Sequence, residues 1–328
     1  MNEMPPHVHV LQLLMGLWHA QVVAAAARFG VADLMARGVH DVDSMAQECG
    51  ADPGALYRLL RGGAAIGICL ETDPRHFTLT PAGECLRSDA ETSLRDFLIA
   101  ETAPGHWLPW GKLYEAVRDG HSVAGEVLGM PPWEYYAKNP EEGLSFARGM
   151  GNLSAIVAQD VTRVYDASGF KKIVDVGGSQ GVLLKSLLAT NPDATGVLFD
   201  LPEVIANAPV DPRIERVGGD FFKECPPGGD LYLLKSILHD WPDDRCTEIL
   251  KSIHGAAKPG AKLLIVEMLL PDTPQPSPVA LMDLNMLVML DGRERTSADM
   301  AALLATGGFR VERVIPAGMF SLIEAVAT

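Results

Sequence analysis

The sequence has no run of lysine or arginine residues, and basic residues are few for its length. It holds 42 acidic residues against 27 basic ones, which gives a formal net charge of -15 over 328 residues. Nucleic acids and anionic membrane surfaces attract basic protein surfaces. We therefore expect neither of them to be a partner.

Closely spaced cysteines are also missing. The five cysteines stand at positions 49, 69, 85, 225 and 246, with no C-x-x-C pair and an odd total. Such spacing provides neither a disulfide framework nor a zinc site. We expect buried or inert thiols.

A signal peptide is not apparent at the start, which reads Met1-Asn2-Glu3-Met4-Pro5-Pro6. Its basic segment and apolar core are lacking, and we expect no apolar run of membrane-spanning length. This predicts a cytoplasmic protein that does not enter a membrane.

Apolar residues make up 48% of the chain, enough for two modest cores. We predict three parts: a helical, winged-helix-like dimerisation domain over residues 1–100, connecting helices over 101–165 that contribute to a substrate pocket, and a cofactor-binding catalytic domain over 166–328. Residues 11–27 are apolar almost all round, which favours a homodimer interface, although the core helix of a monomer gives the same pattern.

The predicted winged helix consists of helices at 31–36, 43–48 and 55–66 followed by a strand at 77–80. The third helix of this fold often reads DNA, so a DNA-binding regulator is an alternative function. Residues 41–88 hold seven acids against four basic residues, whereas a phosphate-binding surface is basic. We favour a packing module.

The connecting region gathers aromatic residues that are able to line a pocket, among them Trp107. Phe146, Met150 and Leu153 follow at i, i+4 and i+7, a helical stripe that suits an ordinary core as well as a pocket. Met282, Met286 and Met289 add soft apolar side chains, which favours a flat, adaptable pocket for an aromatic molecule.

Strands and helices alternate from Ile173 onward. Strands are predicted at 173–176, 196–199, 213–217, 230–238, 262–270, 309–315 and 321–326. This pattern predicts a Rossmann-like, doubly wound α/β domain. The short turn at Pro316-Ala317-Gly318 makes the last two strands antiparallel.

The first of these strands ends in Asp175 and the turn Gly177-Gly178-Ser179-Gln180-Gly181, with a helix following. Glycines between a strand and a helix N-terminus allow a ligand close to the backbone, although they also suit a simple tight turn. Asp200 ends the next strand, where a carboxylate binds ribose hydroxyls.

Two features favour S-adenosylmethionine over a dinucleotide. Asp175 precedes the glycines, where a carboxylate repels a pyrophosphate but attracts an ammonium or sulfonium group. Asp220 and Phe221 end the third strand, in position to bond and stack an adenine.

His239 follows the strand at 230–238 and reaches the same crevice. A histidine with its ordinary pKa near ~6.5 is largely neutral and able to take a proton from a phenol. Glu267, which ends a buried strand, is a candidate to orient it, and so is Glu294, for which a surface ion pair with Arg293 or Arg295 is the alternative. Asp240, Asp243 and Asp244 suit a helix start better than a metal cluster.

The chain resembles the plant-type and bacterial natural-product class I O-methyltransferases over essentially its whole length. The resemblance rests on Val174-Asp175-Val176-Gly177-Gly178, Asp200-Leu201-Pro202, Gly219-Asp220-Phe221-Phe222, Leu234-Lys235, Leu238-His239-Asp240-Trp241, Glu267 with Leu270-Pro271, and Arg293-Glu294-Arg295-Thr296. The family commonly has a third glycine where this chain has Ser179.

The resemblance implies methyl transfer from S-adenosylmethionine to a hydroxyl, with S-adenosylhomocysteine as product and no metal. The cofactor would contact residues around the glycine turn and the next strand ends: Asp175, Gly177, Gly178, Asp200, Leu201, Asp220, Phe221 and Lys235. The pocket would include Trp107, Phe146, Met150, Leu153, Asp240, Met286 and Met289. Glu294 would lie beside His239. The closest alternative is a relative that binds the cofactor without transferring its methyl group.

Overall fold

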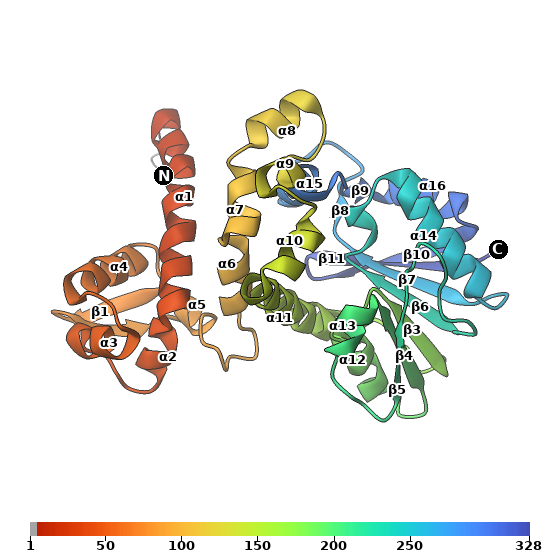
Figure 1. The fold of residues 1–328 in the computed structure, drawn as a ribbon, viewed down its shortest axis with the longest axis horizontal. Coiled ribbons are helices and arrows are strands. Elements are labelled where there is room, and N and C mark those ends of the chain that lie inside the picture. The colour runs from red at the N-terminus through yellow and green to blue at the C-terminus, as the bar shows by residue number, and fades with distance from the viewer. Residues whose placement is uncertain (1–4) are drawn as a thin grey trace. The chain divides into compact units, whose positions relative to one another are not determined.

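The computed structural model describes residues 5–328 and divides into two compact units, one formed by Met1–Trp107 with Tyr136–Leu153 and the other by Leu108–Tyr135 with Ser154–Thr328. Figure 1 shows the elements of both. We call them the helical unit and the sheet unit. Residues 1–4 lie outside the described residues. They include the beginning of the predicted first domain and most of the segment in which a signal peptide was not apparent. The predicted boundaries after residues 100 and 165 stay predictions.

The helical unit begins with the predicted winged helix. Its elements are α1 (Pro6–Phe29), α2 (Val31–Ala36), α3 (Val42–Cys49), α4 (Pro53–Ala65), β1 (Cys69–Asp73), β2 (His76–Leu79), α5 (Pro81–Glu84) and α6 (Arg95–Glu101). The carboxylates of Asp41 and Asp52 accept hydrogen bonds from backbone N–H groups and cap α3 and α4, as such residues do. Strands β1 and β2 pair antiparallel.

Helix α1 is exposed along an apolar face. It has 24 residues, a mean hydropathy of 1.5 over its most apolar 18-residue window, and only 17% of that window buried. The exposed side chains include Val10, Leu11, Leu13, Leu14, Leu17 and Trp18. By length and composition this helix is able to span a membrane, so the expectation that no apolar run reaches that length was wrong.

The chain then crosses between the units. The connecting helices are α7 (Pro104–Trp110), α8 (Leu113–Asp119), α9 (Ala124–Leu128), α10 (Pro132–Lys138) and the long α11 (Pro140–Val164). Helix α11 begins in the helical unit and ends in the sheet unit.

The sheet unit contains a seven-stranded sheet in the order β10-β11-β7-β6-β3-β4-β5. Its strands are β3 (Lys172–Val176), β4 (Thr195–Asp200), β5 (Ile214–Gly218), β6 (Leu231–Lys235), β7 (Lys262–Glu267), β10 (Phe309–Ala317) and β11 (Phe320–Ala327). Strands β3 to β7 run parallel, and β11 pairs antiparallel with both β7 and β10. This confirms the doubly wound fold with its antiparallel tail.

Helices cover the sheet on both faces because its strands alternate between two buried sets of side chains. Val174, Tyr232 and Leu263 belong to one core cluster together with side chains of α14 (Asp243–Ala256) and α16 (Ser297–Thr306). Ile173 and Leu264, which alternate with them, are also fully buried. The remaining helices are α12 (Val182–Thr190), α13 (Pro202–Ala206) and α15 (Val279–Leu290).

Two predicted strands are shorter than expected. The run at 230–238 leaves the sheet after Lys235, because Ser236 takes a left-handed conformation with φ 53° and the single 3-10 turn η1 (Leu238–Asp240) follows. The run at 262–270 divides into β7 and β8 (Leu269–Leu270), and β8 pairs in parallel with β9 (Arg295–Thr296). This small second sheet brings the chain around Glu294 next to the chain that follows Glu267.

Candidate functional site

The glycine turn is tied to the end of the neighbouring strand by Asp200. Its two carboxylate oxygens accept hydrogen bonds from the Ser179 N–H at 2.8 Å and from the Leu201 N–H at 2.7 Å. Ser179 adopts φ 52°, a left-handed conformation that glycine takes more easily. Ser179 therefore takes a conformation that a glycine at this position would also accept. Each Asp200 oxygen retains a second lone pair for a ligand hydroxyl.

Side chains from two other strand ends converge on Gly177. A Cβ at this position would lie 2.6 Å from Ile237 Cδ1 and 3.6 Å from Phe221 Cε1, and its φ is 70°. Gly178 is equally confined, since a Cβ there would lie 2.6 Å from the Asp175 carboxyl carbon. Gly177 is favoured by its left-handed conformation as well as by close approach, and Gly178 by close approach alone.

We expect Gly177→Ala to weaken S-adenosylmethionine binding by about tenfold or more, because the added Cβ overlaps Ile237 at a φ that non-glycine residues rarely adopt. Calorimetric titration of the folded variant measures this. Gly255→Ala in α14 is the matched control, since nothing lies within 4 Å of a Cβ there. Equal affinity in both variants would show that the turn does not hold the cofactor.

Asp220 and Phe221 stand at the end of the third strand as predicted. Asp220 accepts a hydrogen bond from the Phe222 N–H at 3.0 Å and pairs with the Lys223 ammonium at 3.1 Å. The Phe221 ring packs edge-to-face against Phe222, with 4.8 Å between ring centroids, and against Trp241. The aromatic face expected for an adenine is thus held beside Gly177.

Asp175 near the end of β3 and Lys235 at the end of β6 interact electrostatically. Asp175 is only 3% exposed. Burial raises the pKa of Asp175 to about 7, opposed by the nearby charge of Lys235. Burial also lowers the pKa of Lys235, and the Asp175 and Glu267 carboxylates oppose that shift. Lys235 therefore interacts electrostatically both with Asp175 next to the glycine turn and with Glu267 next to the histidine.

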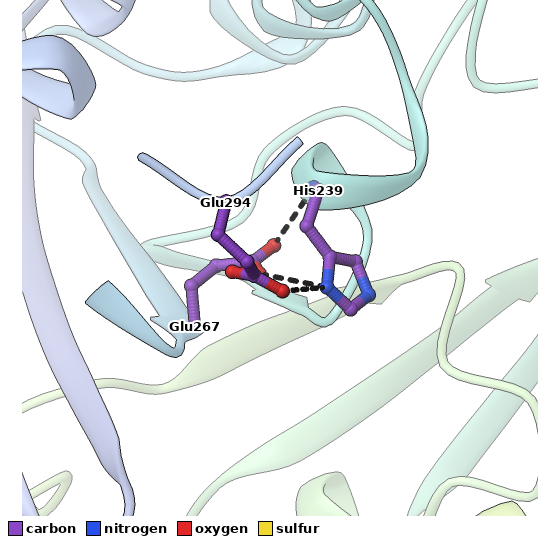
Figure 2. A group of neighbouring side chains, drawn as sticks. All are labelled: His239, Glu267 and Glu294. Atoms are coloured by element: carbon purple, nitrogen blue, oxygen red, sulfur yellow. Dashed lines mark hydrogen bonds and ion pairs between the residues drawn. The ribbon is translucent and has the colours of Figure 1, made fainter. Parts of the chain in front are cut away.

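Two buried glutamates lie on the Nδ1 side of the His239 ring (Figure 2). Its Nδ1 is 2.8 Å from Glu294 Oε1 and 3.7 Å from Glu267 Oε2, and both glutamate side chains are 1% exposed. Its other ring nitrogen, Nε2, lies 3.3 Å from Asp240 Oδ1. The predicted association of His239, Glu267 and Glu294 is present, and we call these three residues the histidine cluster.

Glu267 also organises the backbone that carries the histidine. Its Oε1 accepts hydrogen bonds from the N–H groups of Ile237, Leu238 and His239 at 3.1, 3.0 and 3.4 Å. The second oxygens of Glu267 and Glu294 are buried without a hydrogen-bond partner within residues 5–328. Unmade bonds of this kind are costly, so the cluster is a candidate functional site.

The acids change the protonation of the histidine. Burial disfavours the imidazolium, but the charges of Glu267 and Asp240 and the hydrogen bond to Glu294 outweigh it and raise the pKa of His239 to about 10. This direction favours the imidazolium, in contrast to the neutral ring expected from an ordinary pKa. Burial also raises the pKa of Asp240, to about 6, while His239 opposes that shift.

The alternative of a surface ion pair for Glu294 is wrong. Glu294 is 3% exposed and bonds His239. Both neighbouring arginines instead bind Asp243, Arg295 at 2.7 Å and Arg293 at 2.5 Å. Helix α14 begins at Asp243, and its first turn holds Asp243 and Asp244 as predicted.

The histidine cluster has the residue types of a metal site, and its candidate ligand atoms lie within 4.8 Å of one another. Ligands of a tetrahedral zinc ion stand about 3.4 Å apart, given metal-ligand distances of about 2.1 Å. The 2.8 Å separation of His239 Nδ1 and Glu294 Oε1 is instead that of a charge-assisted hydrogen bond. The described geometry therefore favours proton chemistry.

The predicted pocket residues occur in both units. In the helical unit, the Phe146 ring stacks on Tyr136 with centroids 4.7 Å apart, on the same helix as Met150 and Leu153. Trp107 lies on α7. In the sheet unit, Asp240 faces the histidine, while Met286 and Met289 are 5% and 4% exposed on α15. Met289 belongs to a small core cluster with Val123 and Ala124. The pocket assignment stays a prediction.

Sequence reasoning missed two residues that support the histidine cluster. The Asp283 carboxylate on α15 accepts a hydrogen bond from the Glu294 N–H at 2.8 Å. The Arg295 guanidinium is buried and binds the backbone around His239. Asp283 stands in no motif, and Arg295 belongs to the run Arg293-Glu294-Arg295-Thr296 without any role predicted for it beyond an ion pair. Only the chain path between α15 and α16 shows their targets.

The described geometry agrees with known proteins. The O-methyltransferase dimerisation domain matches residues 11–89, and the O-methyltransferase domain matches residues 110–310. The phenazine O-methyltransferase PhzM of Lysobacter antibioticus is 38% identical over 96% of this chain and 95% of its own. The 3-amino-4-hydroxybenzoate 4-O-methyltransferase of Streptomyces cremeus is 36% identical over 93% of this chain and 86% of its own.

A solved structure extends the likeness to the fold and the cofactor. Human N-acetylserotonin methyltransferase in complex with S-adenosylmethionine has a TM-score of 0.92 and 29% identity, with 99% of each chain covered. A family match over most of the chain, together with relatives aligned along nearly their whole length, settles its membership. The chain belongs to the S-adenosylmethionine-dependent O-methyltransferases and carries their dimerisation domain.

Proposed function

We propose that this enzyme methylates a phenolic hydroxyl of an aromatic small molecule, with His239 as general base. The observation that carries the proposal is the hydrogen bond of 2.8 Å between His239 Nδ1 and Glu294. It directs the ring so that Nε2 is the nitrogen turned away from both glutamates. The two named relatives act on a phenazine and a hydroxybenzoate, which supports an aromatic acceptor.

The glycine turn and the histidine occupy one edge of the sheet. Gly177 follows β3 and His239 follows β6, and these parallel strands are neighbours. The methyl donor and the base therefore meet at the carboxyl ends of the strands, where open α/β sheets bind ligands. We assign the cofactor to residues along this edge: Asp175, Gly177, Gly178, Asp200, Leu201, Asp220, Phe221 and Lys235.

The acceptor pocket is proposed to include Phe146, Met150, Leu153, Trp107, Asp240, Met286 and Met289. Most of the rate should come from holding acceptor and sulfonium in line, because the methyl group is already activated. We also propose that α1, with its exposed apolar face and its place in the dimerisation domain, pairs two copies in the cytoplasm.

The test uses methyl-labelled S-adenosylmethionine and three acceptor sets that share the same ring systems: free phenols, their methyl ethers and the corresponding aryl amines. We expect label transfer to the phenols, with S-adenosylhomocysteine formed in equal amount. Transfer to the amines alone would contradict the hydroxyl acceptor. Cofactor binding without any transfer would favour the non-methylating alternative.

Metal removal should leave the reaction unchanged. Because the glutamates hold His239 by hydrogen bonding, no proposed step requires a cation. Dialysis against EDTA followed by the labelling assay is expected to retain activity within about twofold, as judged against the 10²- to 10⁴-fold that a general base supplies. Loss of activity that added divalent metal restores would assign the histidine cluster to a metal instead.

A further inference from the structure

We infer that Arg295 is a positioning residue, one that fixes His239 and Glu294 relative to each other for proton transfer. The inference rests on the proposed base function of His239. Arg295 contacts neither ring nitrogen, so any effect on the reaction must pass through the segment that carries the histidine.

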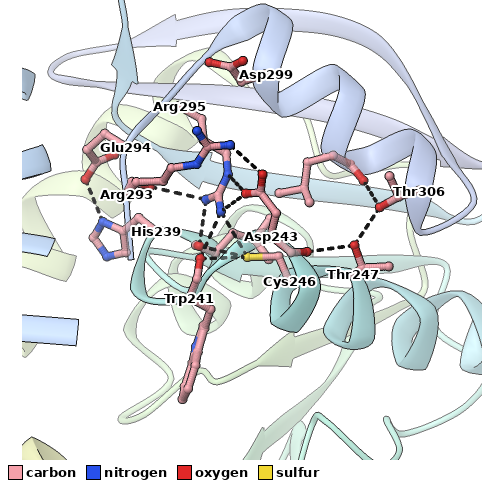
Figure 3. A network of polar contacts seen from close by, with 12 residues as sticks. His239, Trp241, Asp243, Cys246, Thr247, Arg293, Glu294, Arg295, Asp299 and Thr306 are labelled. Atoms are coloured by element: carbon pink, nitrogen blue, oxygen red, sulfur yellow. Dashed lines mark hydrogen bonds and ion pairs between the residues drawn. The ribbon is translucent and has the colours of Figure 1, made fainter. Parts of the chain in front are cut away.

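The Arg295 side chain is 1% exposed and spreads over the backbone on both sides of His239 (Figure 3). Its Nη1 donates to the Leu238 carbonyl at 2.9 Å, and its Nη2 donates to the Trp241 carbonyl at 3.0 Å. Nη2 and Nε also donate to Asp243 Oδ1, at 2.7 and 3.1 Å. One guanidinium thus spans the whole η1 turn and the start of α14.

The η1 turn is therefore held from two sides. Glu267 accepts hydrogen bonds from the Leu238 and His239 N–H groups, and Arg295 donates to the Leu238 carbonyl. The turn follows Ser236, a non-glycine residue at φ 53°. Backbone in such a conformation persists only where its surroundings fix it. Removing either side should let the histidine leave its position.

The segment that carries Arg295 also presses against the histidine. A Cβ at Gly292 would lie 1.9 Å from the His239 carbonyl oxygen, so the two backbones touch. Glu294 is adjacent to Arg295, which pairs with Leu269 in the β8–β9 sheet. Glu294 bonds the ring, and Arg295 bonds the Leu238 and Trp241 carbonyls on either side of the histidine. A shift of Arg295 should therefore change the distance between Glu294 and Nδ1.

A lysine cannot replace this contact pattern. The planar guanidinium offers five donors in a fixed fork, whereas an ammonium presents a compact charge on a flexible stem. Arg295→Lys keeps the charge and loses the span from Leu238 to Trp241. It therefore separates positioning from simple charge balance against Asp243.

The experiment places Arg295→Lys in the wild-type enzyme and in His239→Ala. We expect kcat of the wild type to fall by about tenfold to 10²-fold, with S-adenosylmethionine affinity unchanged and the pH dependence of kcat shifted, because the Glu294 bond that raises the pKa of His239 lengthens. In His239→Ala the same substitution should change the residual rate by less than about twofold, since coupled residues are not additive.

Arg293→Lys is the matched control. Arg293 lies two residues away, is half exposed and shares Asp243, but bonds no carbonyl of the η1 turn through its side chain. It should leave kcat within about twofold. Equal loss from Arg295→Lys with and without His239 would show a purely structural role and overturn the inference, as would an undiminished kcat.

Asp243→Asn is a second test of the positioning role, to be used if the Arg295→Lys variant does not fold. It loosens the anchor of the guanidinium at an exposed position and should reduce kcat by a smaller factor of about two to five, again only when His239 is present. No reduction in a folded Asp243→Asn would also count against positioning. Failure of the base proposal itself appears separately, as full turnover by His239→Ala alone.

Discussion

His239→Ala is expected to lower methyl transfer by about 10²-fold or more while S-adenosylmethionine binds as in the wild type. The alanine removes the proposed acceptor of the phenolic proton and leaves the residues of the glycine turn unchanged. In-line approach of the methyl group remains, so a residual rate should survive. Calorimetry gives the affinity, and single-turnover labelling gives the rate of the chemical step.

The matched control for this variant is His121→Ala, because His121 is exposed in the same unit. It should leave both quantities unchanged. A His239→Ala enzyme with full turnover would exclude the general base. A parallel loss of cofactor affinity would instead indicate that the substitution disturbs the electrostatic interaction between Lys235 and Glu267.

Below pH 9, kcat/KM is expected to rise about tenfold for each pH unit. A base must be unprotonated to act, and the pKa of His239 is raised to about 10, so the active fraction of the free enzyme grows with pH until that value is reached. The rise should level off near pH 10. A histidine with its ordinary pKa near ~6.5 would give a plateau from about pH 7.5.

The raised pKa has a chemical advantage. Phenols have a pKa near ~10, so transfer of the proton to a histidine of pKa ~6.5 is uphill by about 5 kcal/mol. With the pKa of His239 at about 10, the transfer is nearly balanced. The sulfonium charge of bound cofactor opposes the imidazolium. The pH dependence of kcat reports the pKa of His239 in the enzyme complex. The rise of kcat with pH should therefore occur at lower pH than the rise of kcat/KM.

Glu294→Gln tests whether the pKa of His239 causes the rise of kcat/KM with pH. The amide removes one negative charge beside Nδ1, so the pKa of His239 should fall and the rise in kcat/KM should move to lower pH. The rate at the plateau should fall at the same time, because the weaker base takes the proton less readily. The variant should thus lose most at high pH and least near neutrality.

Glu215→Gln is the control, since Glu215 is exposed on the edge strand β5. It should keep the wild-type profile. If kcat/KM of Glu294→Gln rose over the same pH range as in the wild type, the observed pKa would belong to the acceptor hydroxyl or to another group.

Much of the fold followed from local pattern. The alternating buried strands and the glycine turn predicted the doubly wound sheet, because periodicity reports which faces of an element are covered. Two strand ends were misjudged, at Ser236 and after Glu267. Apolar sequence continues through both points, and only the backbone conformation and the β8–β9 pairing end the strands there.

The site was predictable to the extent that it lies at strand ends. His239 and Glu267 end or follow buried strands, and parallel strands in one sheet bring their carboxyl ends together. Glu294 follows no such strand, and local sequence alone favoured an ion pair with its arginine neighbours. Family likeness placed it beside His239, and the structure shows the contacts: Asp283 accepts a hydrogen bond from the Glu294 N–H, and the next residue, Arg295, binds the Leu238 carbonyl next to the histidine.

The sequence by itself determined the chemistry that is available: a glycine turn with acids for a cationic cofactor, and a histidine on the same edge. Tertiary structure decided the protonation of the histidine and the exposure of the first helix. Burial disfavours the imidazolium, but the charges of Glu267 and Asp240 and the hydrogen bond to Glu294 outweigh it and raise the pKa of His239 to about 10. The exposed face of α1 leaves an apolar helix uncovered within the described chain. Both depend on which distant residues exclude water, and that is a property of packing that no local pattern records.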